Sequence, residues 1–365
     1  MIKITAILKK DPVFSVSLFL ALLSSCFVRP SLADIDWRVL ACLFNLSLII
    51  AALEELKVLD GISIRLLSLQ HNQRKLSVIL VSFTFVSSML ITNDVALITF
   101  VPLTLIISRK AGFDPVYIVI LQTLAANIGS SLTPMGNPQN LFLFSYYHIP
   151  LTSFLGLMLP LVIVGAFWLE LLNRRVSNRN LNFDLSAVEI GDKRKVAVFI
   201  LLFIVVVLAV LRLLDYRLVT VGVVLCTLCL DKTWLRKVDY LLLGTFACFF
   251  IFMGNLSHFT LLNELLQSSF RGAVRPLWAS IFLSQVISNV PCAILIAHYT
   301  VQWKAVLLGV NVGGLGSLVA SMASVIAYKF YRQEYKGHPF LVEFTGCNLL
   351  SLALFSTLAY CFLSF

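Results

Sequence analysis

The sequence predicts an all-α polytopic membrane protein with two inverted repeats, each containing a re-entrant helical hairpin and a broken transmembrane helix. Of its 365 residues, 59% are hydrophobic and 13% are charged, whereas soluble domains average about 45–50% and about 25%. The charges gather in short clusters between apolar runs of about 15–25 residues, which is the length of a helix that crosses about 30 Å of hydrocarbon. This composition excludes an ordinary soluble enzyme.

The excess of basic residues has a topological interpretation. Lys and Arg number 28 against 18 Asp and Glu, yet no basic stripe with interleaved aromatic residues indicates a nucleic-acid partner. With a cytoplasmic N-terminus, the predicted spans leave 21 basic residues inside and seven outside, as the positive-inside rule requires. The seven are Arg29, Arg38, Arg212, Arg217, Arg271, Arg275 and Lys304. About nine spans plus two hairpins satisfy this distribution.

Residues 1–172 form the first predicted half. Its segments are spans at about 14–28 and 37–53, an amphipathic arm at 58–70, a hairpin at about 76–108, a broken helix at about 114–147 and a span at 151–172. The hairpin is inferred because basic residues flank both ends of the apolar run, so both ends should face the cytoplasm, and Thr92-Asn93-Asp94 interrupts its middle. The broken helix is inferred from Gly and Pro residues at mid-membrane depth.

A cytoplasmic linker at 173–195 separates this half from the second, 196–365. The second half contains spans at about 196–213, 218–230 and 241–254, a polar arm at 257–271, a hairpin at about 276–302, a broken helix at about 306–329 and a span at 339–362. Asn289 follows Asn93 by 196 residues and Asn311 follows Asn127 by 184, which indicates one repeated pattern. Since the ends of the two hairpins face opposite sides, the repeats are predicted to be inverted, as in alternating access to one site.

Four polar interruptions at mid-membrane depth mark the candidate site. Polar groups are costly in hydrocarbon unless they line a cavity or hold a ligand. Helix N-termini suit an anion, and exposed carbonyl oxygens suit Na⁺. We therefore predict a substrate site between the hairpin tips and the broken helices. Its candidate residues are Thr92, Asn93, Asp94, Asn127, Asn137, Ser288, Asn289, Asn311, Gly313, Gly316 and Ser317.

Several of these residues have a second interpretation. Asp94 is the acid that falls clearly at membrane depth, so it is a candidate for proton coupling, but Asp also suits the start of the second hairpin helix. The two roles are compatible. Asn127 and Asn311 could simply bridge main-chain groups where a helix is broken. The glycines could serve main-chain geometry and close approach alone.

Three segments carry a resemblance to a known family. They are Asn93-Asp94-Val-Ala-Leu-Ile, then Ala126-Asn127-Ile-Gly129 with Thr133-Pro134-Met-Gly136-Asn137-Pro138-Gln139-Asn140, and Gln285-Val-Ile-Ser288-Asn289-Val-Pro291. Together they resemble the ion transporter superfamily, which includes the ArsB arsenite pumps, the NhaD sodium–proton antiporters, the CitM citrate carriers and the INDY-type sodium–dicarboxylate carriers. Within it, the chain resembles most specifically the short bacterial inner-membrane proteins of the YbiR type.

The resemblance implies an elevator-type movement of one domain and a site at the Ser/Thr-Asn tips. It adds Gly129, Thr133 and Pro134 to the candidates, with Na⁺ as an optional coupling ion near Thr92, Asn93, Gly129 and Thr133. The chain departs from the pattern in two places. Asp94 stands where sodium–dicarboxylate members have Thr, as in arsenite-pump-like members. The second half has Gly316-Ser317-Leu318 where the first has Thr-Pro, so the resemblance does not extend to a second sodium site.

The expected function is secondary active transport of a small anion or oxyanion, coupled to H⁺ or Na⁺, across a bacterial inner membrane. The alternative within transport is a Na⁺/H⁺-type antiporter in which Asp94 carries the cation. A channel is less favoured, because paired hairpins in inverted halves suit alternating access better. An enzyme is disfavoured because no catalytic or metal-ligand cluster falls at membrane depth. No resident cofactor is expected. The expected partners are the lipid bilayer and the substrate, with a homodimer left open.

Overall fold

The computed structural model describes residues 12–67, 72–181, 189–259, 264, 267–335 and 340–364, which contain helices and no named β-strand. The helices of the first half are α2 (Pro12–Ser25), α3 (Trp37–Glu55), α4 (Val58–Leu67), α5 (Gln73–Ile91), α6 (Asn93–Ala111), α7 (Val116–Ser130), α8 (Pro138–Tyr146) and α9 (Leu151–Asn173). Those of the second half are α10 (Lys193–Val210), α11 (Tyr216–Leu230), α12 (Tyr240–Leu256), α14 (Val274–Ile287), α15 (Asn289–Ala297), α16 (Trp303–Gly313), α17 (Met322–Glu334) and α18 (Phe340–Ser364).

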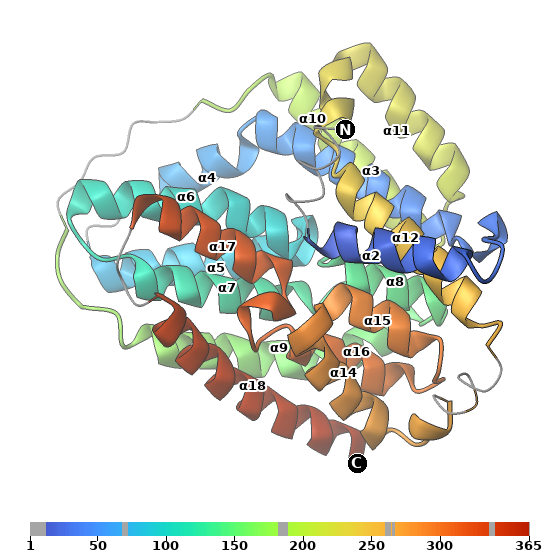
Figure 1. Ribbon diagram of the computed structural model, residues 1–365. Coiled ribbons are helices and arrows are strands. Elements are labelled where there is room, and N and C mark those ends of the chain that lie inside the picture. Colours follow the sequence, from blue (N-terminus) through green and yellow to red (C-terminus); the bar gives the residue numbers. More distant parts are fainter. Residues whose placement is uncertain are drawn as a thin grey trace.

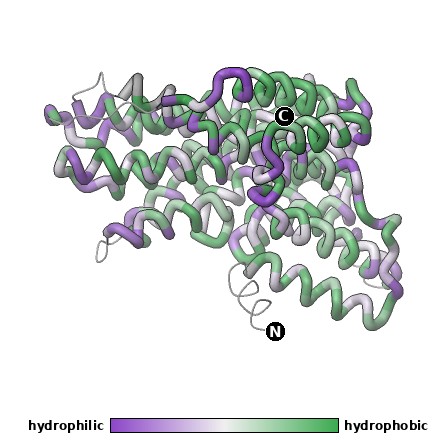
Figure 2. The backbone as a smooth tube through the Cα atoms, turned by 90° about the horizontal axis from the view of Figure 1, so that it is seen from above, coloured by the Kyte–Doolittle hydropathy of each residue, from purple (hydrophilic) through white to green (hydrophobic). Residues whose placement is uncertain are grey.

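The helices have the length and composition of a multi-pass membrane protein. Among the described residues, α3, α5, α9 and α18 are each long and apolar enough to cross a membrane, and several shorter helices are equally apolar. Figure 2 shows hydrophobic residues along most helices, with hydrophilic residues mainly at helix ends and connections. Large apolar side chains such as Phe167, Leu218 and Val342 are exposed on the outside of the protein, where lipid can cover them. The predicted all-α polytopic class is confirmed.

Side-chain caps fix where several helices begin. The side-chain oxygens of Asp36, Asn72 and Asp239 accept hydrogen bonds from main-chain N–H groups in the first turns of α3, α5 and α12, respectively. These N–H groups have no partner within their own helix, so a cap of this kind stabilises the start of a helix by about 0.5–2 kcal/mol. The polar residue before each apolar run therefore sets the start of the helix.

The helices form two groups (Figure 1). In the first group, α3 packs on α10 and α11, and α12 packs on α2 and α3. In the second, α5 lies along α7, α14 along α16, α6 against α17 and α15 against α8, while α9 and α18 cover α7 and α16. We call them the outer group (α2, α3, α10, α11, α12) and the hairpin group (α5–α9, α14–α18). The groups meet chiefly where α3 contacts α8 and α12 contacts α15.

The two hairpin segments predicted from the sequence are pairs of helices that pack on each other and join at a single residue. Thr92 joins α5 to α6, and Ser288 joins α14 to α15. The first hairpin has two helices of 19 residues, whereas the second has helices of 14 and 9 residues. Its second helix ends at Ala297, before the expected boundary at 302, and α17 continues to Glu334, beyond the expected 329.

Both predicted broken helices are interrupted where the sequence indicated. Residues 131–137 separate α7 from α8, and residues 314–321 separate α16 from α17. Parts of the two predicted arms, near 68–71 and 260–266, lie outside the described residues apart from residue 264. The depth of the hairpins in the membrane and the inverted orientation of the halves stay predictions.

Candidate functional site

The two hairpin tips share an unusual main-chain conformation. Thr92 has φ 85° and ψ 148°, and Ser288 has φ 72° and ψ 157°. A positive φ is uncommon outside glycine, and holding such a residue in this region costs about 1–3 kcal/mol. Each tip carries this strain immediately before an asparagine that begins the next helix. Strained positions of this kind cluster at functional sites, which directs attention to the space around both tips.

The tips are tied to the broken helices by equivalent hydrogen bonds. The Thr133 hydroxyl donates to the Met89 carbonyl oxygen, and the Ser317 hydroxyl donates to the Gln285 carbonyl oxygen at 3.0 Å. Ser317 follows Thr133 by 184 residues, and Gln285 follows Met89 by 196, the same two offsets that the sequence showed. The second half therefore keeps the hydroxyl contact of the first, although its sequence reads Gly-Ser-Leu instead of Thr-Pro.

Asn127 and Asn311 each bind the broken helix of the other half. The Ser321 hydroxyl donates to Asn127 Oδ1 at 2.9 Å, and Asn137 Nδ2 donates to Asn311 Oδ1 at 3.1 Å. Asn311 Nδ2 also donates to Asn140 Oδ1 at 2.7 Å. Because all of these side chains are buried, leaving any of them unpaired would cost about 1–3 kcal/mol. The two asparagines thus hold the halves together.

Two glycines allow these helices to approach each other closely. A Cβ atom on Gly129 of α7 would overlap the carbonyl oxygen of Phe85 on α5. A Cβ atom on Gly313 of α16 would meet the side chain of Ser284 on α14 at 2.7 Å, which is closer than real Cβ contacts. The interpretation that glycine serves close approach is therefore sufficient at both positions.

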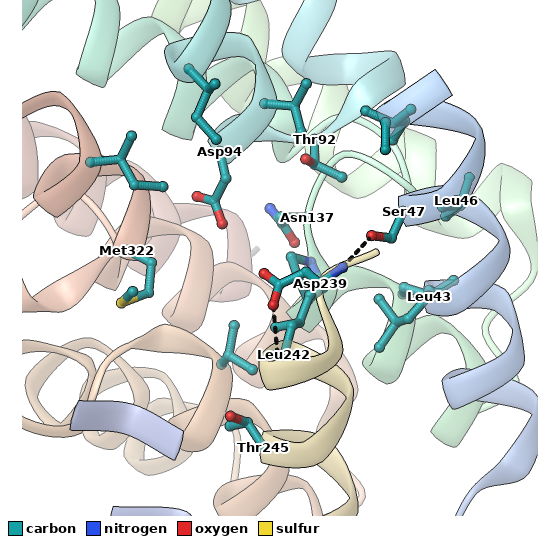
Figure 3. Close-up of a pocket in the computed structure, with 18 of the residues that line it drawn as sticks. Leu43, Leu46, Ser47, Thr92, Asp94, Asn137, Asp239, Leu242, Thr245 and Met322 are labelled. Atoms are coloured by element: carbon teal, nitrogen blue, oxygen red, sulfur yellow. Dashed lines mark hydrogen bonds between the residues drawn. The ribbon is translucent and has the colours of Figure 1, made fainter. Parts of the chain in front are cut away.

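A cavity of about 410 Å³ lies where the hairpin group meets the outer group. The hairpin group contributes Thr92, Asp94, Val95, Ile98, Met135, Asn137, Pro138, Leu141, Ser288, Val290, Pro291, Met322 and Ile326. The outer group and its connections contribute Val13, Leu43, Leu46, Ser47, Ile50, Ala51, Glu54, Lys237, Asp239, Leu242 and Thr245. Both hairpin tips and both broken helices reach this one space, and Figure 3 shows polar side chains directed into it from both groups.

Helix N-termini converge on the cavity. The first residues of α6, α8, α15 and α17 or their caps line it, so four helices of the hairpin group point their N-terminal ends at the same space. The start of α12, capped by Asp239, adds one from the outer group. Of the four hairpin-group caps, only Asn137 makes a side-chain cap bond, to Asn140 N. Each helix N-terminus carries about half a positive charge, and its free N–H groups suit an anion.

Asp94 introduces a carboxyl group beside these N-termini. It lies in the first turn of α6, and Figure 3 shows its carboxylate directed into the cavity. Its Oδ1 atom is buried and has no hydrogen-bond partner in the described part of the chain. Asp94 therefore does not cap its helix at this oxygen, because no N–H group donates to it. A buried, unpartnered carboxyl oxygen favours a proton or a ligand as its missing partner.

Four of the fourteen predicted site residues line the cavity, namely Thr92, Asp94, Asn137 and Ser288. The other ten, which are not among its lining residues, are Asn93, Asn127, Gly129, Thr133, Pro134, Asn289, Asn311, Gly313, Gly316 and Ser317. Several of these form the hydrogen bonds and close contacts described above, which hold the tips in place. Buried Asn93 donates through Nδ2 to Asn127 Oδ1 at 3.3 Å, and its own Oδ1 has no partner among the described residues.

Sequence reasoning missed the outer group's polar contribution. Ser47, Glu54, Lys237 and Asp239 all line the cavity, and Lys237 also forms an ion pair with Glu55. Glu54, Lys237 and Asp239 lie at helix ends or in a connection, where the linear pattern indicates a water interface and not a site. The main-chain N–H of Asp239 donates to the Ser47 hydroxyl at 3.0 Å, which joins α12 to α3. Such a contact between distant segments leaves no signal in one sequence.

The described residues contain no group of three or more His, Cys, Asp or Glu that could hold a metal ion. Na⁺ needs no such cluster, because carbonyl and amide oxygens also bind it. The unpartnered Oδ1 of Asn93 is one such oxygen at the first tip. The Thr133 hydroxyl, which the resemblance assigned to an ion site, donates to the Met89 carbonyl oxygen, and its lone pairs stay available to a cation.

A multi-pass helical protein whose hairpin tips and broken helices enclose one polar cavity has the architecture of a membrane transporter. The chain belongs to the CitMHS family, described as citrate transporters, which it matches over residues 4–327. This finding confirms the resemblance seen in its motifs.

Three relatives extend the comparison. The chain is 34% identical over 312 residues to an uncharacterised transporter of Methanocaldococcus jannaschii, covering 84% of this chain and 85% of that protein. It is 30% identical over 304 residues to the inner membrane protein YbiR of Escherichia coli, covering 81% and 80%. It is 22% identical over 333 residues to a 46 kDa membrane protein of Mycobacterium leprae, covering 80% and 78%. The protein is therefore a membrane transporter by family.

Proposed function

We propose that this transporter moves a small anion or oxyanion together with a proton across a bacterial inner membrane. The observation that carries the proposal is the convergence of four helix N-termini on one cavity that also contains the unpartnered carboxyl oxygen of Asp94. The N-termini favour a negative ligand. The N-terminus of the chain is proposed to lie in the cytoplasm, in agreement with the distribution of basic residues.

Electrostatics links the anion to the proton. Two like charges about 4 Å apart repel by about 4 kcal/mol at an effective dielectric constant of about 20, so an anion beside ionised Asp94 would bind weakly. Protonation of Asp94 removes this repulsion. The anion and the proton therefore favour each other's binding, which is the condition for symport. Na⁺ bound near Asn93 Oδ1 would serve the same purpose, and we keep it as the alternative coupling ion.

An elevator-type movement agrees with the position of the cavity between the outer group and the hairpin group. The tips and broken helices are bonded to one another within the hairpin group, as Ser317 to Gln285 and Asn137 to Asn311 illustrate. Contacts between the two groups are mainly those of α3 with α8 and α12 with α15. We propose that the hairpin group moves as one body along the outer group and carries the ligand with it.

Ligand binding is the first test. Purified protein is heated with citrate, dicarboxylates, arsenite, other oxyanions or Na⁺, and its unfolding temperature is measured. We expect one anion to raise this temperature more at low pH than at high pH, because binding to the folded state stabilises it. Asn93→Ala and Asn289→Ala should each reduce the shift. A panel without any stabilising anion would contradict the proposal.

Transport is the second test. Proteoliposomes that contain the wild-type protein should take up the anion faster under an inward pH gradient, and in Asp94→Asn this acceleration should fall by about tenfold or more. Asp215→Asn, which changes a capping residue at the start of α11, is the control. Undiminished acceleration by the pH gradient in Asp94→Asn would exclude Asp94 as the coupling group.

Cation exchange is the second candidate function. It is favoured by the carboxyl groups of Asp94 and Asp239 in the same cavity, because two carboxylates attract a cation. In that case Na⁺ alone should stabilise the purified protein, and no anion of the panel should add to its effect. An unfolding temperature that an anion raises in a pH-dependent way would favour anion transport over cation exchange.

A further inference from the structure

Asp239 is the polar residue of the outer group that lies opposite Asp94. Figure 3 shows the two carboxylates on different walls of the cavity, Asp94 on the hairpin group and Asp239 at the start of α12. The position of Asp239 is fixed, because its Oδ1 accepts a hydrogen bond from Leu242 N at 3.0 Å and its N–H donates to the Ser47 hydroxyl at 3.0 Å. Asp239 is exposed, whereas Oδ1 of Asp94 is buried.

We infer that Asp239 accepts the proton carried by Asp94 and releases it to water on the side of the membrane where α3 ends and α12 begins. The inference rests on the proposed function, in which Asp94 carries the proton. In the transfer, the O–H bond of Asp94 breaks and an O–H bond forms on Asp239, directly or through one water molecule, and Asp239 then loses the proton to water. No other bond changes. Because Asp239 is exposed, it can pass the proton on to water.

The surroundings of the pair support this path. The other charged residues that line the cavity are Glu54 and Lys237, and Lys237 forms an ion pair with Glu55. No histidine of the described part of the chain lines the cavity. Glu54 and Lys237 line the cavity near the end of α3 and just before the start of α12, where Asp239 also lies. Asp239, which is exposed, is therefore the carboxyl group that the outer group sets across the cavity from Asp94.

The division into two helix groups would make the acceptor available in only one state. Asp94 belongs to the hairpin group and Asp239 to the outer group, so movement of one group along the other separates the two carboxyl groups. The equivalent position in the second tip, 196 residues after Asp94, is Val290, which carries no charge. Asp239 can therefore accept a proton in one conformation only, and only from the first tip.

The test uses three variants of the intact protein. Asp239→Asn and Asp239→Ser remove the charge but keep an N-cap acceptor, so α12 should still form, and Asp239→Glu restores the carboxyl group. Asp215→Asn is the matched control, since Asp215 is also an N-cap, whose side-chain oxygen accepts a hydrogen bond from Arg217 N at the start of α11. Citrate is the transport probe, with succinate and arsenite in parallel, and each is measured both in pH-driven uptake and in exchange at equal pH.

We expect Asp239→Asn and Asp239→Ser to slow pH-driven uptake about tenfold and to slow exchange, which requires no net proton release, by a clearly smaller factor. Asp239→Glu should recover most of the uptake. An equal decrease in both modes would overturn the inference, because it would mean that Asp239 only shapes the entrance. Unchanged uptake in both variants would also overturn it.

Infrared spectroscopy of the ligand-free protein provides a measurement that does not depend on the substrate. The carbonyl band of protonated Asp94 is identified by its loss in Asp94→Asn. In Asp239→Asn, the pH at which this band disappears should differ from the wild-type value by about one unit. The band should not shift in Asp215→Asn. An unshifted band in Asp239→Asn would show that the carboxyl groups do not interact. If the wild-type protein transports none of the probes, the proposed function fails. The infrared band still shows whether the carboxyl groups of Asp94 and Asp239 interact.

Discussion

The two hairpin tips have the same main chain but different chemistry. Thr92 and Ser288 adopt nearly the same strained conformation, and an asparagine follows each of them. The next residue is Asp94 in the first tip and Val290 in the second, and both line the cavity. The scaffold of the site is therefore duplicated, whereas its ionisable group is not. Among the described residues of the hairpin group that line the cavity, Asp94 carries the one carboxyl group.

Moving the carboxyl group from the first tip to the second would test this difference most severely. In the double variant Asp94→Asn with Val290→Asp, the new carboxyl group faces the same cavity but lies beside a different helix start. We expect about a tenth of the wild-type pH-driven uptake to return, because the position but not the surroundings is equivalent. Uptake by proteoliposomes measures this recovery, and Val290→Asn in the same background is the control. Full recovery would mean that the two tips are interchangeable.

The close contacts of the two halves should differ in their tolerance of a methyl group. A Cβ atom at Gly129 would lie 2.3 Å from the Phe85 carbonyl oxygen, whereas one at Gly313 would lie 2.7 Å from Ser284 Cβ, so the overlap is more severe at Gly129. We expect destabilisation by about 3 kcal/mol at Gly129 and by about 1–2 kcal/mol at Gly313. Thermal unfolding of purified protein measures both values.

Gly156→Ala on α9 is the control for this pair, since no atom lies within 4 Å of the added Cβ. It should leave stability unchanged or raise it slightly, because alanine favours a helix more than glycine does. Equal losses at Gly129 and Gly313 would contradict the expectation that the closer overlap at Gly129 costs more stability.

The smallest expected effect concerns the strain at the tips. Thr92→Gly should stabilise the protein by about 1 kcal/mol, because glycine adopts a positive φ without steric cost. Ser288→Gly should gain less, since the Ser288 hydroxyl donates to the Ala320 carbonyl oxygen at 3.4 Å and this bond would be lost. Unfolding temperatures of the two variants compare the tips directly. A destabilised Thr92→Gly would indicate that the Thr92 side chain contributes more than the strain costs.

The sequence determined the fold class, the approximate bounds of the helices and the positions of the four interruptions. These features are linear, because the thickness of hydrocarbon fixes the length of an apolar run and a polar interruption in such a run is costly wherever it packs. The two offsets of 196 and 184 residues also follow from the sequence alone. The same offsets relate the Thr133 and Ser317 hydroxyl contacts in the structure.

The tertiary structure decided which of these residues face the cavity and which support it. Asn127 and Asn311 bind the opposite half, and Gly129 and Gly313 serve helix contacts, although the sequence marked all four as site candidates. Conversely, Asp239 enters the cavity from a helix end that the linear pattern assigns to the water interface. The physical reason is that the direction of a side chain depends on how helices from distant segments pack, and hydrophobic length and polar interruptions carry no information about that packing.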